Sequence, residues 1–254
     1  MNGRVYLVGA GPGAPDLLTL RAARLLEIAD IVLHDALVHP DTLALATKAR
    51  LVDVGKRSRA RSTDQRFICR FLVSAAKRYP IVVRLKGGDP MIFGRAQEEL
   101  DALRDAGIEV EVVPGITAAL AASAQIKAPL TRRGDSRSVA FLTPRVGAGQ
   151  SPSAWASGSR AADTLAIYMS ARDASNTLDQ LIEAGWSTDT PIALVESASL
   201  PGSEAWRGVL RQLPELSQRV GSGPVMVLAG AALGPLTDQE TVFDHSPLSR
   251  STRM

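Results

Sequence analysis

The sequence predicts an α/β protein with two α/β domains, and three observations support that prediction. In residues 4–125, short apolar segments alternate with segments whose apolar residues recur at helical spacing. The short segments, such as "RVYLVG" and "PIVVRLKG", are apolar almost throughout, which is typical of parallel strands covered by helices on both faces. Beyond residue 125 the strand candidates are separated by polar connectors, which indicates a second domain with a more mixed sheet.

The first domain is expected over residues 1–130. Strands are expected at residues 4–9, 30–35, 50–55, 80–87 and 108–115, and helices at 17–29, 62–79, 93–107 and 116–124. Ser62 or Thr63 is the expected N-cap of the second helix, because a hydroxyl oxygen can accept a hydrogen bond from the first turn. Gly107 is expected to end the third helix.

The second domain is expected over residues 137–240, after the connector "APLTRRGD". Its strand candidates lie at residues 138–143, 164–169, 191–197, 206–210 and 224–230, with helices near 176–184 and 210–220 and a polar loop at 147–160. Residues 241–254 have no periodicity and are expected to form a flexible tail.

Composition favours an ordinary water-soluble protein. The chain has 254 residues, of which 45% are hydrophobic and 22% charged. Its first apolar segment is too short for a signal peptide and no run is long enough to span a membrane, so we expect a cytoplasmic protein without a membrane partner. With one cysteine, Cys69, no internal disulfide can form, and we expect this side chain to be buried. The three histidines lack metal-ligand spacing, so no metal is expected.

Basic residues gather in two stretches, which leaves two interpretations open. The stretches contain Lys56, Arg57, Arg59, Arg61, Arg66 and Arg70, and then Arg132, Arg133 and Arg137. They can form solvated faces or bind a polyanionic ligand. Nucleic acid is disfavoured as that ligand, because aromatic residues make up only 4% of the chain and offer no stacking platform.

Two glycine-rich loops follow strand candidates. In "GAGPGAPD", Gly9, Gly11 and Ala14 fit the dinucleotide-binding pattern, with Asp35 near the place of a ribose-binding carboxylate. Pro12 weakens that interpretation because it removes an N–H donor. The second loop, "KGGDP", stays unexplained by a dinucleotide site. Its glycines permit positive φ and let a ligand approach the backbone, although a simple turn would use them too.

In order, "VYLVGAGPGAPDLLTLRA", "ADIVLHDALV", "VGKRS", "RLKGGDPMIFGR", "VVPGITAALAA" and "PLTRRG" closely resemble the tetrapyrrole methylase family, up to about Leu236. The resemblance implies a tetrapyrrole methylase-like fold whose two α/β domains hold S-adenosyl-L-methionine in a cleft between them, and a homodimer. It also implies methylation of uroporphyrinogen III at two ring carbons, C2 and C7, giving precorrin-2 via precorrin-1 for siroheme or cobalamin, with S-adenosyl-L-homocysteine as the second product.

The resemblance also implies which residues contact the cofactor. They are Pro12, Gly87, Gly88, Asp89, Ile92, Thr117, Ala118, Met169 and Ala198. Ala198 stands where the family commonly has glycine, and "FLTPR" departs from the family pattern, so Pro144 and Arg145 are given no role. Structural alternatives remain: Thr117 can be a capping residue, and Met169 can be core packing.

Two further residues match positions proposed in the family for proton transfer. Asp35 corresponds to a proton acceptor and Lys56 to a proton donor. Structural alternatives remain for both residues: Asp35 can orient a loop, and Lys56 can attract carboxylates. The polycarboxylate substrate implied by the resemblance would account for some of Arg57, Arg59, Arg61, Arg132 and Arg133.

Two other functions stay open. A related methylase could act on a later corrin precursor, an rRNA ribose or a modified protein histidine, although "RLKGGDPMIFGR" favours uroporphyrinogen III. A nucleotide-binding module without catalysis would not need the full ordered set of motifs.

Overall fold

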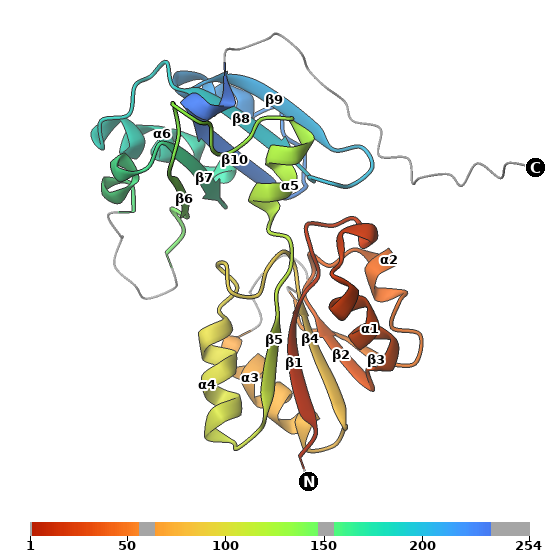
Figure 1. Ribbon diagram of the computed structural model, residues 1–254. Coiled ribbons are helices and arrows are strands. Elements are labelled where there is room, and N and C mark those ends of the chain that lie inside the picture. Colours follow the sequence, from red (N-terminus) through yellow and green to blue (C-terminus); the bar gives the residue numbers. More distant parts are fainter. Residues whose placement is uncertain (1, 56–63, 147–154, 235–254) are drawn as a thin grey trace, which may run out of the picture. The chain divides into compact units, whose positions relative to one another are not determined.

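The computed structural model describes residues 2–55, 64–146 and 155–234, and the chain divides into two compact units, residues 1–118 and 119–254 (Figure 1). The division lies earlier than the expected domain end at residue 130. Helix α5 (Ala118–Gln125) falls almost entirely in the second unit, where the Gln125 side chain bonds Ser203. The expected tail at 241–254 lies outside the described residues.

The first unit is built on a fully parallel sheet. Its strands are β1 (Arg4–Gly9), β2 (Ile31–His34), β3 (Arg50–Asp53), β4 (Ile81–Lys86) and β5 (Val110–Val113), in the order β3-β2-β4-β1-β5. The apolar character of the strands predicted this arrangement, and the structure confirms it. The central strands β4 and β1 therefore carry their following loops side by side at one edge of the sheet.

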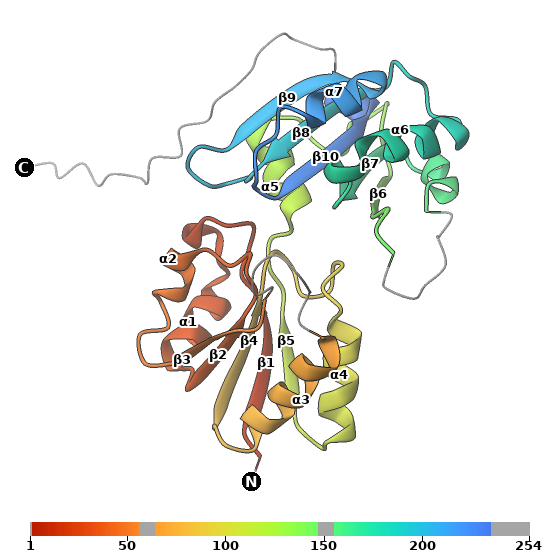
Figure 2. The ribbon, with the colours of Figure 1, turned by 180° about the vertical axis from the view of Figure 1, so that it is seen from behind.

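Helices cover both faces of this sheet. They are α1 (Leu20–Ile28), α2 (Pro40–Leu43), α3 (Gln65–Ala76) and α4 (Ala96–Asp105), after a short 3-10 turn at Pro15–Leu17. Figures 1 and 2 show α1 and α2 on one side of the sheet and α3 and α4 on the other. Successive residues of β4 face opposite cores: Val82 packs with Leu72 and Leu103, and Val83 with Leu26.

The starts of α3 and α1 differ from the sequence prediction, and their N-caps explain the difference. The N-cap of α3 is Asp64, whose Oδ1 accepts the Arg66 N–H at 2.9 Å, so Ser62 and Thr63 were wrong. A carboxylate is as good a cap as a hydroxyl, so sequence spacing alone does not show which of these residues is the N-cap. Helix α1 begins at Leu20 because Thr19 Oγ1 accepts the Ala22 N–H at 3.1 Å. Helix α2, a single turn, was not predicted.

The second unit contains a mixed sheet, as the sequence predicted. Its strands are β6 (Val139–Leu142), β7 (Thr164–Tyr168), β8 (Pro191–Glu196), β9 (Glu204–Val209) and β10 (Val225–Gly230), in the order β6-β7-β10-β8-β9. Only β6 and β7 pair in parallel; the other neighbours are antiparallel. Helices α6 (Ala174–Glu183) and α7 (Leu213–Ser217) contribute Leu181 and Leu213 to a core with Leu165 and Leu194.

The expected helix over residues 210–220 is shorter than predicted, because a 3-10 turn at Leu210–Gln212 precedes α7. The polar loop expected at 147–160 contains a 3-10 helix from Ser157 to Ala161 in its described part. Cys69 on α3 is half-buried rather than buried, and its Sγ lies 3.5 Å from the carbonyl oxygen of Glu98. No helix in the described part of the chain has the length and apolar character needed to cross a membrane.

Candidate cofactor and proton-transfer site

The two glycine-rich loops of the first unit pair with each other beyond the ends of their strands. The Gly88 N–H donates to the Gly11 carbonyl at 2.7 Å, and the Gly11 N–H donates to the Gly88 carbonyl at 3.2 Å. The Ala10 N–H also donates to the Lys86 carbonyl at 2.8 Å. The amides of both glycines are thus engaged within the protein, unlike the outward-facing amides of a phosphate-binding loop.

A third loop, after β5, packs against the first two through another glycine. A β-carbon built on Gly9 would lie 2.6 Å from the Cα of Gly115, and one on Gly115 would collide with the Gly88 carbonyl oxygen. Side chains of any size are therefore excluded where these backbones meet. Gly9 and Gly115 both lie in motifs of the family resemblance, but the sequence did not indicate that they pack against each other.

Gly88 has a different requirement from Gly9 and Gly115. Its φ is +67°, in the left-handed region that favours glycine. A β-carbon there would find only the Thr117 Cα at 3.8 Å and the Ala118 N at 4.0 Å. Within its own unit, Gly88 therefore presents bare backbone to open space. Gly87 is more confined, since its β-carbon would lie 3.1 Å from the Leu37 Cβ.

Asp89 joins two of the loops. Its Oδ1 accepts the Met91 N–H at 2.8 Å and its Oδ2 accepts the Gly115 N–H at 2.9 Å. The carboxylate therefore shapes the β4 loop and fixes it to the β5 loop.

The other predicted cofactor residues of this unit lie on the same three loops. Pro12 and Ile92 are half-buried on the β1 and β4 loops, while Thr117 is buried and Ala118 begins α5. The structure thus brings together all of the predicted cofactor residues of the first unit.

Met169 and Ala198 lie at the ends of two strands in the second unit. β7 and β8 both run antiparallel to β10, so they are parallel to each other and their carboxyl ends share one sheet edge. Met169 has φ +59° and is 45% exposed, which does not fit the core-packing alternative. Ala198 is buried in a turn whose neighbours Ser197 and Ser199 have φ of +51° and +73°.

Gln125, which sequence reasoning missed, secures the turn around Ala198. Its Nε2 donates to the Ser203 Oγ at 2.8 Å, and its Oε1 accepts the Ser199 N–H at 3.1 Å. The side chain of Gln125 is buried, so both bonds are shielded from water. Left-handed backbone in residues other than glycine persists only where such contacts hold it.

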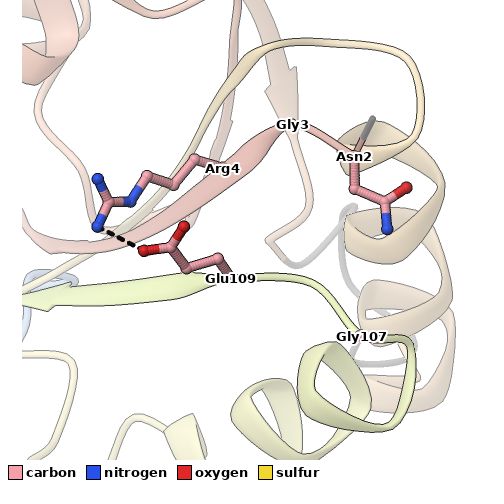
Figure 3. A pocket seen from close by; sticks show the side chains of 5 residues that line it. All are labelled: Asn2, Gly3, Arg4, Gly107 and Glu109. Atoms are coloured by element: carbon pink, nitrogen blue, oxygen red, sulfur yellow. Dashed lines mark ion pairs between the residues drawn. The ribbon is translucent and has the colours of Figure 1, made fainter.

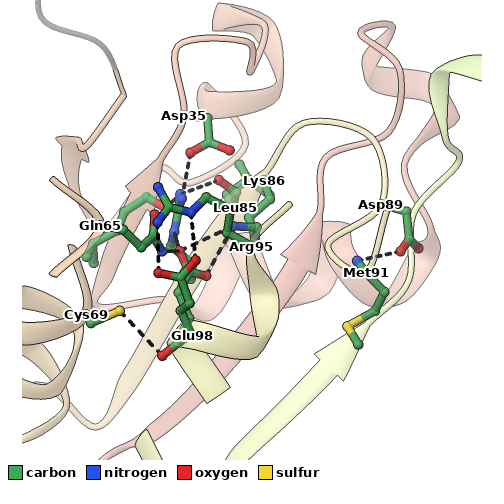
Figure 4. A network of polar contacts seen from close by, with 12 residues as sticks. Asp35, Gln65, Cys69, Leu85, Lys86, Asp89, Met91, Arg95 and Glu98 are labelled. Atoms are coloured by element: carbon green, nitrogen blue, oxygen red, sulfur yellow. Dashed lines mark hydrogen bonds and ion pairs between the residues drawn. The ribbon is translucent and has the colours of Figure 1, made fainter. Parts of the chain in front are cut away.

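Asp35, the predicted proton acceptor, belongs to a network of charged side chains in the first unit (Figure 4). Its Oδ1 lies 2.6 Å from the Arg84 Nη2, and the Arg84 Nε lies 3.1 Å from the Glu99 Oε1. Lys86 Nζ contacts both oxygens of Glu99, at 3.2 and 3.3 Å. Lys56, the predicted proton donor, lies outside the described residues, as do Arg57, Arg59 and Arg61.

Burial and neighbouring charges affect the two bases of this network differently. Burial lowers the pKa of Lys86, the Arg84 guanidinium lowers it further, and Glu99 only partly offsets these effects. Burial also acts to lower the pKa of Arg84, but Asp35 and Glu99 outweigh it, so that pKa is raised. Arg84 is therefore a permanent cation beside Asp35.

A sequence signal for this network existed. Arg84 and Lys86 interrupt an otherwise apolar strand at a spacing of two, which places both side chains on one face of a buried sheet. Buried cations require partners, so an acidic residue on a covering helix was to be expected. By contrast, the sequence gave no sign of the left-handed backbone at Phe93 and Arg95, whose φ values are +49° and +55°.

Arg132, Arg133 and Arg137 are exposed in the second unit. Arg132 lies 3.7 Å from Asp135, and its backbone pairs with Ser136 in a short turn.

A shallow pocket lies at the other end of the first sheet (Figure 3). It is lined by Asn2, Gly3, Arg4, Gly107 and Glu109, and Arg4 and Glu109 form an exposed ion pair at 2.7 Å. Arg4 begins β1, whereas the glycine loops follow the ends of the strands, so this pocket is separate from the predicted site.

Comparison with known proteins extends over both units. The family described as Tetrapyrrole (Corrin/Porphyrin) Methylases matches residues 4–214. The chain is 43% identical over 240 residues to a uroporphyrinogen-III C-methyltransferase of Pseudomonas aeruginosa, covering 94% of this chain and 98% of that protein.

Solved structures give the same result. Uroporphyrin-III C-methyl transferase from Thermus thermophilus, complexed with S-adenyl homocysteine, matches with a TM-score of 0.80 and 39% identity over 91% of this chain and 98% of that one. A cobalt precorrin-4 methyltransferase matches with a TM-score of 0.79 and 29% identity over 91% and 96% of the two chains. With its glycine loops in the expected places and a family match across most of its length, this chain belongs to the tetrapyrrole methylases.

Proposed function

We propose that this protein transfers methyl groups from S-adenosyl-L-methionine to C2 and C7 of uroporphyrinogen III, giving precorrin-1 and then precorrin-2 for siroheme or cobalamin synthesis. The observation that carries the proposal is the 43% identity to the Pseudomonas aeruginosa uroporphyrinogen-III C-methyltransferase over 98% of that protein. The tetrapyrrole and S-adenosyl-L-methionine are therefore its small-molecule partners.

The glycine loops fit S-adenosyl-L-methionine. Gly88 offers bare backbone with open space beside it, and the paired amides of Gly11 and Gly88 leave no cradle for a pyrophosphate. The Thermus thermophilus relative, 39% identical, is complexed with S-adenyl homocysteine. We assign binding to the loop residues Pro12, Gly87, Gly88, Asp89, Ile92, Thr117 and Ala118, together with Met169 and Ala198. Asp89 contributes by holding the β4 and β5 loops together.

Bound S-adenosyl-L-methionine supplies an electrophilic methyl group on a sulfonium. The protein's part is to align an electron-rich ring carbon with that methyl group and to exclude water. When the new C–C bond forms, the C–S bond breaks and the ring system gains a positive charge. Loss of a proton from a substrate carbon to Asp35 returns the electron pair of the C–H bond to the ring system, and Lys56 donates a proton elsewhere on the macrocycle.

The arginines Arg57, Arg59, Arg61, Arg132 and Arg133 are proposed to include those that bind the substrate carboxylates, because guanidinium groups bind carboxylates in bidentate fashion. The described members of this set are exposed and hence accessible to a ligand.

A homodimer is proposed as well, on the resemblance to the family. Static light scattering over a dilution series checks it: the expected mass is twice that of the 26.9 kDa chain. A single species of monomer mass at micromolar concentration would rule the dimer out.

Anaerobic incubation of the purified protein with S-adenosyl-L-methionine and uroporphyrinogen III tests the function. We expect the absorbance spectrum of a dimethylated product and two S-adenosyl-L-homocysteine molecules per tetrapyrrole. Omitting the methyl donor is the control. A later corrin precursor should be tested in parallel, because the cobalt precorrin-4 methyltransferase has a similar TM-score. Turnover of that precursor without turnover of uroporphyrinogen III would refute the proposal.

A further inference from the structure

The cluster formed by Arg84, Lys86, Glu99, Gln65 and Asp35 is unusual for its burial. Arg84 is 2% exposed and Glu99 is fully buried. Replacing a buried ion pair by apolar residues of similar volume is often neutral or stabilising, so such a cluster is weak evidence for a purely stabilising role. Because Arg84 contacts Asp35, the predicted proton acceptor, we look for a role in positioning that side chain.

Arg84 is held in a single orientation. Its Nη1 donates to the carbonyl oxygens of Leu33 at 3.4 Å and Leu85 at 3.2 Å, while its Nε donates to Glu99 at 3.1 Å. These contacts use two sides of the planar guanidinium and aim the Nη2 at Asp35, 2.6 Å away.

Glu99 on α4 is the anchor for Arg84. In addition to Arg84, it accepts hydrogen bonds from Lys86 on β4 at 3.2 and 3.3 Å and from Gln65 on α3 at 3.1 Å. Two helices and a central strand therefore meet at this one carboxylate. Glu99 cannot move without breaking its contacts with both β4 and α3.

Asp35 is the most exposed member of the cluster, with 30% of its side chain accessible to solvent. It directly follows β2, and its backbone N–H donates to the Leu85 carbonyl at 3.3 Å. Arg84 binds the Oδ1, whereas the Oδ2 has no hydrogen-bond partner among the residues the structure describes. Among the described residues, one carboxylate oxygen is thus held by Arg84 and the other is left without a partner.

We propose that Arg84, anchored by Glu99, is a positioning residue that aims the Oδ2 of Asp35 at the substrate carbon that loses its proton after methyl transfer. This inference rests on the proposed function. In the step, the C–H bond breaks, its electron pair neutralises the positive charge on the ring system, and the proton moves to Asp35. The adjacent guanidinium keeps Asp35 in place while its charge changes, and Arg84 itself touches neither substrate nor cofactor.

A double-mutant cycle separates this role from simple stabilisation. The variants are Arg84→Met, Arg84→Lys, Asp35→Asn and Asp35→Asn/Arg84→Met, all in the full chain. For each, kcat and KM for uroporphyrinogen III, the Kd for S-adenosyl-L-homocysteine by calorimetry, and the circular dichroism spectrum are measured. Arg104→Met is the matched control, because Arg104 also pairs with a carboxylate, that of Asp101, but lies on α4 with its side chain 68% exposed.

We expect Arg84→Met to lower kcat about tenfold or more, since general acid–base catalysis contributes on the order of 10²–10⁴-fold. The KM and the S-adenosyl-L-homocysteine Kd should stay near wild type, and Arg84→Lys should restore part of kcat. In the Asp35→Asn background, Arg84→Met should have no further effect. Arg104→Met should behave as wild type.

Three results would overturn the inference. The first is that Arg84→Met lowers kcat by the same factor with and without Asp35, which would indicate a general structural effect. The second is that Arg84→Met leaves kcat unchanged. The third is that Asp35→Asn is itself fully active. If Arg84→Met does not fold, Arg84→Lys, which keeps a charge for Glu99, takes its place in the cycle. Wild-type protein that does not methylate uroporphyrinogen III would instead refute the proposed function.

Discussion

Gly9 and Gly115 pack backbone against backbone, so that a β-carbon on Gly9 would lie 2.6 Å from the Gly115 Cα. Neither backbone can move aside freely, because Gly9 ends a central strand and Gly115 is bonded to Asp89.

Gly9→Ala should consequently destabilise the protein by about 1–3 kcal/mol or more, the usual cost of overpacking a well-packed site. Thermal unfolding measures the loss. Gly158→Ala is the matched control, because a β-carbon at Gly158 meets nothing within 4 Å. Equal melting temperatures for the two variants would show that the loops separate more easily than this packing indicates.

Gly88→Ala should weaken cofactor binding beyond its effect on stability. Gly88 and Gly107 have nearly the same φ, +67° and +65°, so alanine at either should cost roughly 1–2 kcal/mol of backbone strain. Only Gly88 lies on the proposed cofactor loops. Calorimetric titration should give a Kd for S-adenosyl-L-homocysteine raised at least about tenfold in Gly88→Ala, or about 1.4 kcal/mol, and unchanged in Gly107→Ala. Unchanged affinity in both variants would show that the second glycine loop is only a turn and does not contact the cofactor.

Gln125→Ala should loosen the turn that carries Ala198. The change removes the acceptor of the Ser199 N–H and the donor to Ser203, at a cost of about 1–3 kcal/mol for buried polar groups. We also expect weaker S-adenosyl-L-homocysteine binding, because Ala198 would lose its fixed position. Gln97→Ala, which removes an exposed hydrogen bond to Asp101 at 2.9 Å, serves as the control for both measurements. Wild-type stability of Gln125→Ala would contradict the expectation.

Asp163 should make stability depend on acid pH. The Arg137 N–H and then the Ser138 hydroxyl and N–H donate to its carboxylate and hold its pKa below the ordinary value of 3.8. The contribution is therefore present above pH 3.8 and is lost as pH falls through the lowered pKa of the folded state. Asp163→Asn should unfold more easily than wild type in urea at pH 7, and the difference should shrink as the pH falls below 3.8. If the stability difference between Asp163→Asn and wild type stays constant with pH, the substitution acts through packing and not through the charge of Asp163.

Much of the fold could be predicted from the sequence because buried parallel strands are apolar on both faces. The apolar run "IVV" in β4 carries that signal directly, and the helical spacing of the leucines in α1 predicts a covering helix. The N-cap of α3 was less accessible, since Ser62, Thr63 and Asp64 are all good caps and only the folded chain selects among them.

The site was predicted unevenly for a related reason. Residues on the loops, such as Gly88 and Asp89, form contiguous motifs that a sequence displays. Glu99 and Gln125 act through contacts with residues elsewhere in the chain, and an isolated Glu or Gln in a helix resembles any solvent-facing residue. Within the buried charged network, only Arg84 and Lys86 could be noticed in the sequence, as charges in an otherwise apolar strand.

The parallel pairing of β1 with β4 also affects how the protein is made. Gly11 near the amino terminus finds its partner, Gly88, only after most of the first unit has been synthesised. Until then β1 is an apolar segment with unpaired edges, and closing so long a loop is slow. The two paired glycine loops therefore cannot form early as a local nucleus; they are completed together with the sheet. During that interval the emerging chain is most exposed to aggregation, and a ligand that binds the finished loops can act only after this folding step.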